Sequence, residues 1–113
     1  MKHSPNYLGL SLAGVFYRER DDWMRSLTSD PDLSMNAKAA GCYLAVRVNK
    51  KTRDAFPQQT TMAKELGVSR ATVMRAVAEL VKTGWLSVEQ GRRGKHAAVN
   101  RYALVMPWAK VAP

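Results

Sequence analysis

The stretch MAKELGVSRATVMRAVAELVKTGWL, residues 62–86, decides the fold of this 113-residue chain. Apolar residues recur at helical spacing on both sides of Gly67, which adopts the left-handed conformation of a tight turn without strain. Ser69 follows as a good N-cap, because its hydroxyl can accept from a first-turn amide. The pattern predicts a short helix that ends at Gly67, one tight turn, and a longer helix from Ser69 through Thr83.

The longer helix is predicted to have two different faces. At about 100° per residue, its apolar side chains gather on one side. They are Val73, Ala76, Val77, Leu80 and Val81. The other side carries small, polar or charged residues: Ala71, Thr72, Arg75, Glu79 and Lys82. Gly84 stands in the C′ position where helices end. We expect the apolar side to face a core and the other side to face solvent.

A helix is also predicted before this stretch. Ser34 is a natural N-cap after the turn-like SDPD, and the helix should end near Asn49. One face is small and apolar, which suits close helix packing. Its residues are Ala37, Ala40, Gly41, Leu44, Ala45 and Val48. The segment KKTRDAFP follows as a basic loop, and Thr60 or Thr61 caps the short helix that Gly67 ends.

Two strand-like segments follow Gly84. WLSVEQ has Trp85 or Leu86 and Val88 as apolar positions, and NRYALVM repeats the alternation with Tyr102, Leu104 and Met106. The loop between them holds four basic side chains: Arg92, Arg93, Lys95 and His96. The prediction is a mainly α fold with a small β-hairpin, in which residues 34–106 form a three-helix core plus a two-stranded wing and residues 107–113 form a short tail.

Residues 1–33 are predicted to form an N-terminal extension with one short amphipathic helix. Its stripe holds Phe16, Glu19 or Arg20, Trp23 and Leu27 at helical spacing. Two interpretations stay open. The stripe either packs on the domain's own core or pairs with a second subunit around Trp23.

The charge of the chain points to an anionic partner. The net charge is +9. Residues 1–33 hold four basic against five acidic side chains, whereas residues 34–113 hold fourteen against four. Such a surplus attracts polyanions at long range and gains affinity from released counterions. We therefore expect nucleic acid to bind the second segment.

Other function classes lack their residues. One cysteine and two histidines, Cys42, His3 and His96, have no metal-ligand or nucleophile–base spacing, and no Walker-type glycine loop occurs, so we expect no enzyme, cofactor or metal. Cys42 is expected to be a small buried hydrophobic residue, and a single cysteine is consistent with a reducing cytoplasm. The apolar run at residues 7–16 is short and broken by glycines, so neither a signal peptide nor a membrane span is expected.

The outward side of the longer helix suits the major groove of DNA. Short Ala71 and Thr72 let the backbone approach, and Arg75 can reach guanine O6 and N7. Met74 and Thr72 can contact a thymine methyl, while Ser69, Arg70 and the first-turn amides suit a phosphate. Other proposed DNA contacts are Lys82 on the helix and the basic residues of the wing: Arg92, Arg93, Lys95 and His96. Further phosphate candidates, with a solvated surface as the alternative, are Thr60, Thr61, Lys50, Lys51 and Arg53.

The segment FPQQTTMAKELGVSRATVMRAVAELVKTGWL resembles the helix-turn-helix pattern of GntR-type repressors and of winged-helix domains in plasmid and phage replication proteins. The matching elements are Phe56-Pro57, Ala63, Leu66 to Arg70, Thr72-Val73, Ala76-Val77, Leu80 and Gly84 to Leu86. The resemblance implies that Ser69, Arg70, Thr72 and Arg75 contact DNA and that the wing touches the minor groove or backbone. GntR-type proteins carry a large effector domain after this part, and replication initiators repeat the winged domain. We expect neither here.

These inferences predict a sequence-specific double-stranded DNA-binding protein, a cytoplasmic and nucleoid-associated transcriptional regulator of bacterial, plasmid or phage type. Because one recognition helix reads only a few base pairs, a homodimer is expected, with the helix around Trp23 as its contact. One alternative is a replication or recombination accessory factor that marks an origin or attachment site. Another is a winged-helix module that binds protein or RNA.

Overall fold

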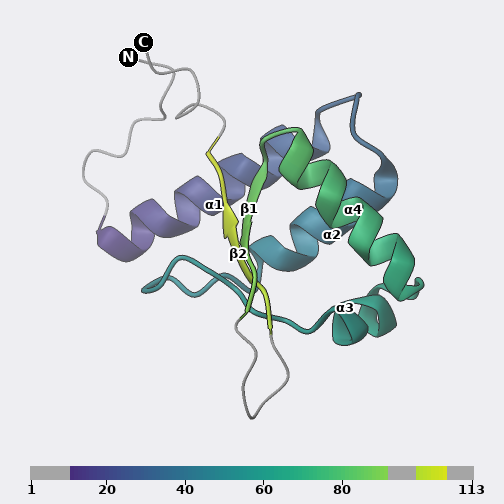
Figure 1. The fold of residues 1–113 in the computed structure, drawn as a ribbon. Helices are drawn as coiled ribbons and strands as arrows, with labels where there is room; N and C mark the ends of the chain where they lie inside the picture. The colour runs from purple at the N-terminus through teal and green to yellow at the C-terminus, as the bar shows by residue number, and fades with distance from the viewer. Residues whose placement is uncertain (1–10, 92–98, 107–113) are drawn as a thin grey trace.

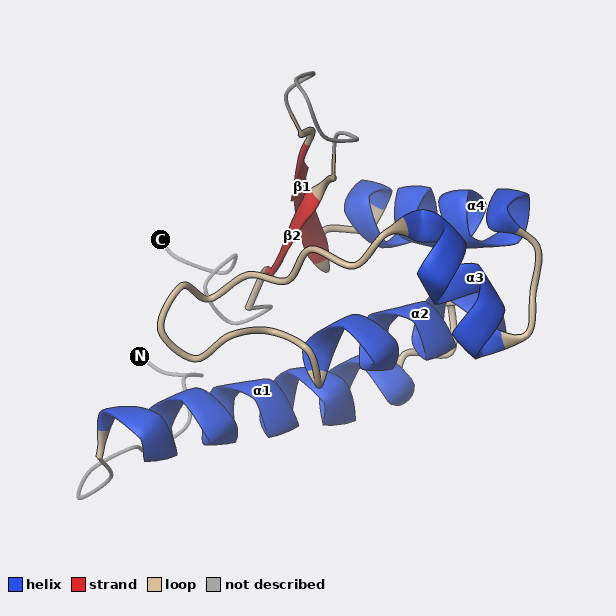
Figure 2. Ribbon diagram, turned by 90° about the horizontal axis from the view of Figure 1, so that it is seen from below, coloured by secondary structure: helices blue, strands red, loops and turns tan. Residues whose placement is uncertain are grey.

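The computed structural model describes residues 11–91 and 99–106. Within them the chain forms four helices and one antiparallel hairpin (Figures 1 and 2). In chain order they are α1 (Leu12–Thr28), α2 (Met35–Ala45), α3 (Gln59–Leu66), α4 (Arg70–Lys82), β1 (Leu86–Glu89) and β2 (Arg101–Leu104). The mainly α fold with a two-stranded wing is confirmed, and the architecture is that of a winged helix-turn-helix.

The turn signals of the deciding stretch act as predicted. Gly67 ends α3 with a φ of 71°, and Gly84 follows α4 with a φ of 87°. Both angles lie in the left-handed region that favours glycine. Ser69 caps α4, because its Oγ accepts from the amide of Thr72 at 3.1 Å. The angle between α3 and α4 is therefore set by local chemistry.

Helix α2 packs closely because its inner face is small. Ser34 caps it by accepting from the amide of Ala37 at 3.0 Å, as predicted. A Cβ added to Gly41 would lie 2.5 Å from Cδ2 of Leu27 and 3.2 Å from Cη2 of Trp23. A larger residue at this position would require Leu27 to shift, so α1 and α2 pack closely at this glycine.

The extension belongs to the core of the same molecule. Trp23 and Leu27 on α1 are fully buried, and they join one cluster with residues of all the other helices and of both strands. The Trp23 Nε1 donates to the backbone oxygens of Trp85 at 3.1 Å and Val105 at 3.0 Å. Its ring meets that of Trp85 edge-on at 5.9 Å. The stripe of α1 therefore packs on the core of the same molecule, which is one of the two interpretations left open above. Trp23 itself is fully buried there, so the expectation that it contacts a second subunit is wrong for this side chain.

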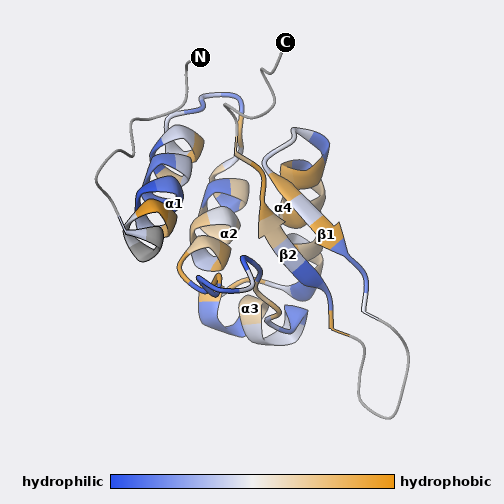
Figure 3. Cartoon of the chain, turned by 90° about the vertical axis from the view of Figure 1, so that its left-hand side faces the viewer, coloured by the Kyte–Doolittle hydropathy of each residue, from blue (hydrophilic) through white to orange (hydrophobic). Residues whose placement is uncertain are grey.

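The hairpin presents its apolar side to the helices. Leu86 pairs with Leu104, and Val88 pairs with Tyr102. Leu86 and Tyr102 are buried, in agreement with the predicted alternation. In Figure 3, α4 is hydrophobic where it runs beside the hairpin, whereas hydrophilic residues dominate the visible face of α1. Ala55 also forms a bridge to Tyr102 on the other edge of β2, which the sequence patterns did not predict.

Helix α2 ends earlier than predicted. Its last residue is Ala45, not a residue near Asn49. The amides of Arg47 and Val48 donate to carbonyls three residues back, at 3.0 and 3.4 Å, so the chain tightens into a turn there.

Two other local predictions are wrong. Helix α3 begins at Gln59 after the N-cap Gln58, which makes no side-chain cap bond, so Thr60 and Thr61 lie inside the first turn instead of capping it. Val81 is 43% exposed. It stands at the edge of the apolar face of α4, where the core no longer covers it. Cys42 is half-buried against the core.

Among the described residues, no helix combines the length and apolar character that crossing a membrane requires.

Candidate nucleic-acid interface

The predicted recognition residues lie on the outer side of α4 and at its N-cap. Six of them are exposed: Ser69, Arg70, Ala71, Met74, Arg75 and Lys82. Thr72 is half-buried. Lys82 lies in the last turn, about 15 Å along the axis from Thr72 at 1.5 Å per residue. The structure therefore gathers the other residues at the start of the helix and places Lys82 at its far end.

Hydrogen bonds connect three of these side chains. The hydroxyl oxygens of Ser69 and Thr72 lie 2.9 Å apart. The Arg75 Nη2 donates to Oγ1 of Thr72 at 3.3 Å. This contact holds the Arg75 side chain along the helix surface toward the N-terminus, and its other nitrogen donors have no protein partner among the described residues.

The carboxylates of the basic segment are occupied elsewhere. Residues 34–113 contain four acidic side chains, and each contacts other parts of the fold. Asp54 and Glu89 pair with Arg101, Glu65 pairs with Arg47 and accepts from Tyr43, and Glu79 accepts from Ser34. Within the described part of the chain, no carboxylate lies at ion-pair distance from Arg70, Arg75 or Lys82. Their positive charge is left uncompensated by the fold.

Glu79 has a structural role that the helix phase alone did not suggest. Its carboxylate accepts from the amide of Ser34 at 2.8 Å and from the hydroxyl of Ser34 at 2.6 Å. These hydrogen bonds hold the pKa of Glu79 below its ordinary value. The contact ties the start of α2 to α4 and keeps this negative charge on the side of α2.

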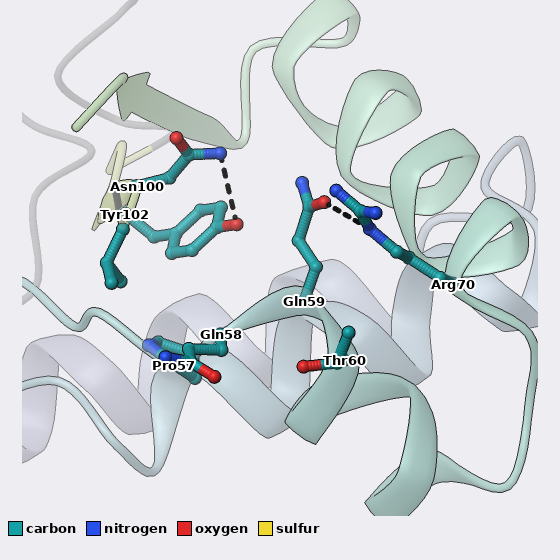
Figure 4. Close-up of a pocket in the computed structure, with 8 residues that line it drawn as sticks. Pro57, Gln58, Gln59, Thr60, Arg70, Asn100 and Tyr102 are labelled. Atoms are coloured by element: carbon teal, nitrogen blue, oxygen red, sulfur yellow. Dashed lines mark hydrogen bonds between the residues drawn. The ribbon is translucent and has the colours of Figure 1, made fainter. Parts of the chain in front are cut away.

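A cleft of about 410 Å³ lies beside the start of α4. The start of α3 forms one wall, and Asn100 and Tyr102 at the start of the second strand form another (Figure 4). Arg70 lines it, and its Nε donates to Oε1 of Gln59 at 3.1 Å. Sequence patterns did not assign Gln59, Asn100 or Tyr102 to a binding site, because no local signal shows that segments so far apart in the chain meet.

The middle of the loop between α2 and α3 does not join this surface, although the end of the loop, at Pro57 and Gln58, lines the cleft. It bends out on the side of the hairpin opposite α4 (Figures 1 and 2). Lys50 and Lys51 are exposed there. The Arg53 Nη1 lies 2.8 Å from Oε1 of Glu19, and its guanidinium lies 5.1 Å from the centre of the Phe16 ring. Arg53, which has a φ of 64°, therefore holds the loop against α1.

The remaining predicted contacts divide into two groups. Thr60 and Thr61 are exposed in the first turn of α3, and Thr60 also lines the cleft. The wing residues Arg92, Arg93, Lys95 and His96 lie outside the described residues. The strands that lead to them end at Glu89 and begin again at Arg101, whose side chains form an ion pair at 3.1 Å.

Among the described residues, no group of three or more His, Cys, Asp or Glu side chains is arranged to hold a metal ion.

Comparison with known families agrees with this geometry. Residues 32–86, just under half of the chain, match a family model described as a helix-turn-helix domain. The match runs from the turn before α2 to the start of β1 and supports a DNA-binding domain, a class of domain that is typically non-enzymatic. No curated protein and no solved structure matches the chain significantly.

Proposed function

We propose that this protein binds double-stranded DNA at specific sequences, with α4 in the major groove, and acts as a transcriptional regulator of bacterial, plasmid or phage type. One observation carries the proposal. Arg70 and Arg75 are exposed at the start of α4, and among the described residues their side chains bond only to the neutral groups of Gln59 and Thr72. Cations that the fold does not neutralise favour a polyanion through counterion release.

The same helix start supplies groups that distinguish bases. Ala71 is exposed and small, so the helix backbone can approach the groove floor. Arg75 suits the two acceptors of a guanine edge, and Met74, which is 49% exposed, suits a thymine methyl. Ser69 and the first-turn amides fit an adjacent phosphate.

The wing adds contacts that do not depend on sequence. Its basic residues Arg92, Arg93 and Lys95 are proposed to meet the backbone or the minor groove, and His96 a phosphate. Lys82 is proposed as an outer phosphate contact, whereas Lys50 and Lys51, on the side of the hairpin away from α4, are not part of this proposal. The resemblance of the segment to GntR-type and replication-protein winged helices supports this arrangement of helix and wing.

A homodimer in the cytoplasm, associated with the nucleoid, completes the proposal. Two recognition helices on a two-fold axis supply the affinity and specificity that one helix rarely reaches. Because Trp23 is buried in the core of its own molecule, it is not the contact of this dimer.

The experiment is selection of the purified protein on random duplex DNA at two salt concentrations, with sequencing of the retained pool. An enriched palindrome supports a dimeric specific regulator and gives its half-site spacing. Retention without enrichment contradicts base recognition by α4. No retention overturns the proposal and favours a protein-binding module.

A further inference from the structure

The cleft beside Arg70 joins the three parts of the fold that a DNA strand would pass. Residues 57–60 at the start of α3 form one side, Arg70 opens α4, and the lead into β2 closes the opposite side (Figure 4). The volume of about 410 Å³ is ample for one phosphate group with its attached oxygens. No acidic side chain is among the described residues that line the cleft.

Tyr102 is the buried member of this lining. Only 1% of its surface is exposed. Its backbone is fixed on both sides, by the pairing with Val88 and by bonds of 2.8 and 2.9 Å to Ala55. The hydroxyl oxygen accepts a long bond of 3.5 Å from Nδ2 of Asn100, and the hydroxyl proton has no acceptor among the described residues. Figure 4 shows this hydroxyl directed into the cleft. A buried donor without a partner is costly, so it calls for an acceptor.

Other donors around the cleft also lack protein partners among the described residues. Arg70 uses only its Nε in the bond to Oε1 of Gln59, which leaves both of its Nη groups and the Gln59 amide nitrogen without protein partners in the described chain. The N-cap Gln58 makes no side-chain bond to the first turn of α3. The cleft therefore offers hydroxyl, guanidinium and amide protons beside the amide oxygens of Gln58 and Asn100, and the charged side chain that lines it is the cation Arg70.

We propose that this cleft seats one phosphodiester group of the DNA backbone, which accepts from the hydroxyl of Tyr102 and from the guanidinium of Arg70. A phosphodiester has two non-bridging oxygens, one negative charge and no proton to donate, which complements one cation with neutral donors. The proposal rests on the proposed DNA binding. It adds that the strand is held between α4 and the hairpin by Tyr102, Asn100 and Gln59, in addition to the exposed face of α4.

The first variant is Tyr102→Phe, which keeps the buried ring and removes only the hydroxyl. Its affinity for the selected duplex is expected to fall about tenfold, by the same factor on random duplexes, because a phosphate contact carries no base information. The matched control is Tyr17→Phe, which removes a hydroxyl from an exposed residue of α1 and is expected to leave affinity unchanged. Unchanged affinity of Tyr102→Phe would overturn the proposed phosphate site.

The second measurement places the contact on the DNA. Duplexes in which one phosphate at a time is a neutral methylphosphonate are bound to the wild type, to Tyr102→Phe and to Arg70→Gln. A methylphosphonate at one position in each half-site is expected to weaken binding by the wild type. The same substitution should have a smaller effect on both variants, because each variant has already lost a contact to that phosphate. If the losses in affinity from the methylphosphonate and from the protein variant were additive at every position, the proposed phosphate site would be contradicted. Arg70→Gln, at an exposed position, keeps the test valid if Tyr102→Phe does not fold.

Two further results distinguish binding of free phosphate from binding of a DNA phosphate, and failure of the phosphate site from failure of the proposed function. Inorganic phosphate at constant ionic strength is expected not to raise the melting temperature of the wild type more than that of Tyr102→Phe. A larger shift in the wild type, without coupling to a methylphosphonate position, would assign the cleft to free phosphate and overturn the DNA seat. If the wild type binds duplex DNA and Arg75→Ala loses base preference while Tyr102→Phe binds normally, only the proposed phosphate site in the cleft is disproved. If the wild type binds no duplex, the proposed function fails first.

Discussion

Two of the three arginines of α1 lie beside carboxylates, whereas neither arginine of α4 does, and this difference separates the part of the molecule that builds the fold from the part that is free to bind. On α1, Arg20 lies 3.3 Å from Asp21, and Arg25 lies 3.4 Å from Asp22. On α4, Arg70 and Arg75 donate, within residues 11–91 and 99–106, only to an amide oxygen and a hydroxyl. A net positive charge alone does not locate a binding surface. The surface is located by whether each arginine side chain has a carboxylate partner.

The two helices also differ in how much of their apolar surface the core uses. Helix α1 inserts the fully buried Trp23 and Leu27 into the core, where Trp23 reaches the backbone of Trp85 and Val105. Helix α4 buries one face and leaves Met74 and Val81 about half exposed. Substitutions on the inner face of α1 should therefore affect stability, and those on the outer face of α4 should affect binding.

The largest expected effect is on stability. Trp23→Ala should lower the free energy of unfolding by about 3–5 kcal/mol, because it removes a fully buried indole and both of its hydrogen bonds. Urea denaturation followed by circular dichroism measures the change. Tyr17→Ala on the same helix, 44% exposed in the wild type, is the control and should cost about 1 kcal/mol or less. Equal losses in the two variants would mean that α1 does not pack as described.

Arg75→Ala should change base recognition without changing the fold. We expect a loss of about 1–3 kcal/mol in binding to the selected duplex, with relaxed preference at one base pair and an unchanged melting temperature. Fluorescence anisotropy with single-base variants of the duplex measures this. Unfolding of the variant would show that Arg75 faces the core, and an unaltered base preference would remove it from the recognition surface.

The wing should contribute affinity that is independent of sequence. Replacing Arg92 and Arg93 together by alanine should weaken binding to selected and random duplexes by the same factor, about tenfold. The dependence of log Kobs on log salt should become shallower by about two units, because two phosphate contacts are lost. Titrations at several salt concentrations provide the slope, and a slope equal to that of the wild type would exclude both residues from phosphate contact.

A smaller effect is expected from Asp54, which holds the α2–α3 loop to the hairpin. Hydrogen bonds from Thr52 and Arg101 hold the pKa of Asp54 below its ordinary value of 3.8. Since the folded pKa is the lower one, the carboxylate stabilises the fold above the ordinary value, and this contribution is lost as the pH falls through the folded pKa. Asp54→Asn should cost about 1 kcal/mol at pH 7 and make the loss of stability below about pH 4 shallower. Denaturant titrations between pH 3 and pH 7 test this, and an acid profile identical to that of the wild type would contradict it.

The sequence predicts the helix-turn-helix well because its signals are local. Gly67 and Gly84 adopt the positive φ that their positions require, and Ser34 and Ser69 cap the helices that follow them. Each signal acts over three or four residues, so it is visible without the rest of the fold.

The cleft and the buried carboxylate could not be predicted in this way. The pair of Asp54 and Arg101 joins residues 47 positions apart. Tyr102 matches an ordinary strand alternation, and nothing local indicates that its hydroxyl lacks an acceptor. Val81 fits the apolar stripe of α4, and only the extent of the core shows that it lies outside. These features depend on which segments meet in space.

The most direct test removes the same charge from each of the two helices. The double variant Arg70→Ala/Arg75→Ala and the double variant Arg20→Ala/Arg25→Ala each take two positive charges from a net charge of +9. Affinity for the selected duplex is then measured at one salt concentration. We predict that the α4 variant loses about 100-fold or more and that the α1 variant stays within about threefold of the wild type. Equal losses would show that total charge alone drives binding, and would contradict the assignment of DNA recognition to α4.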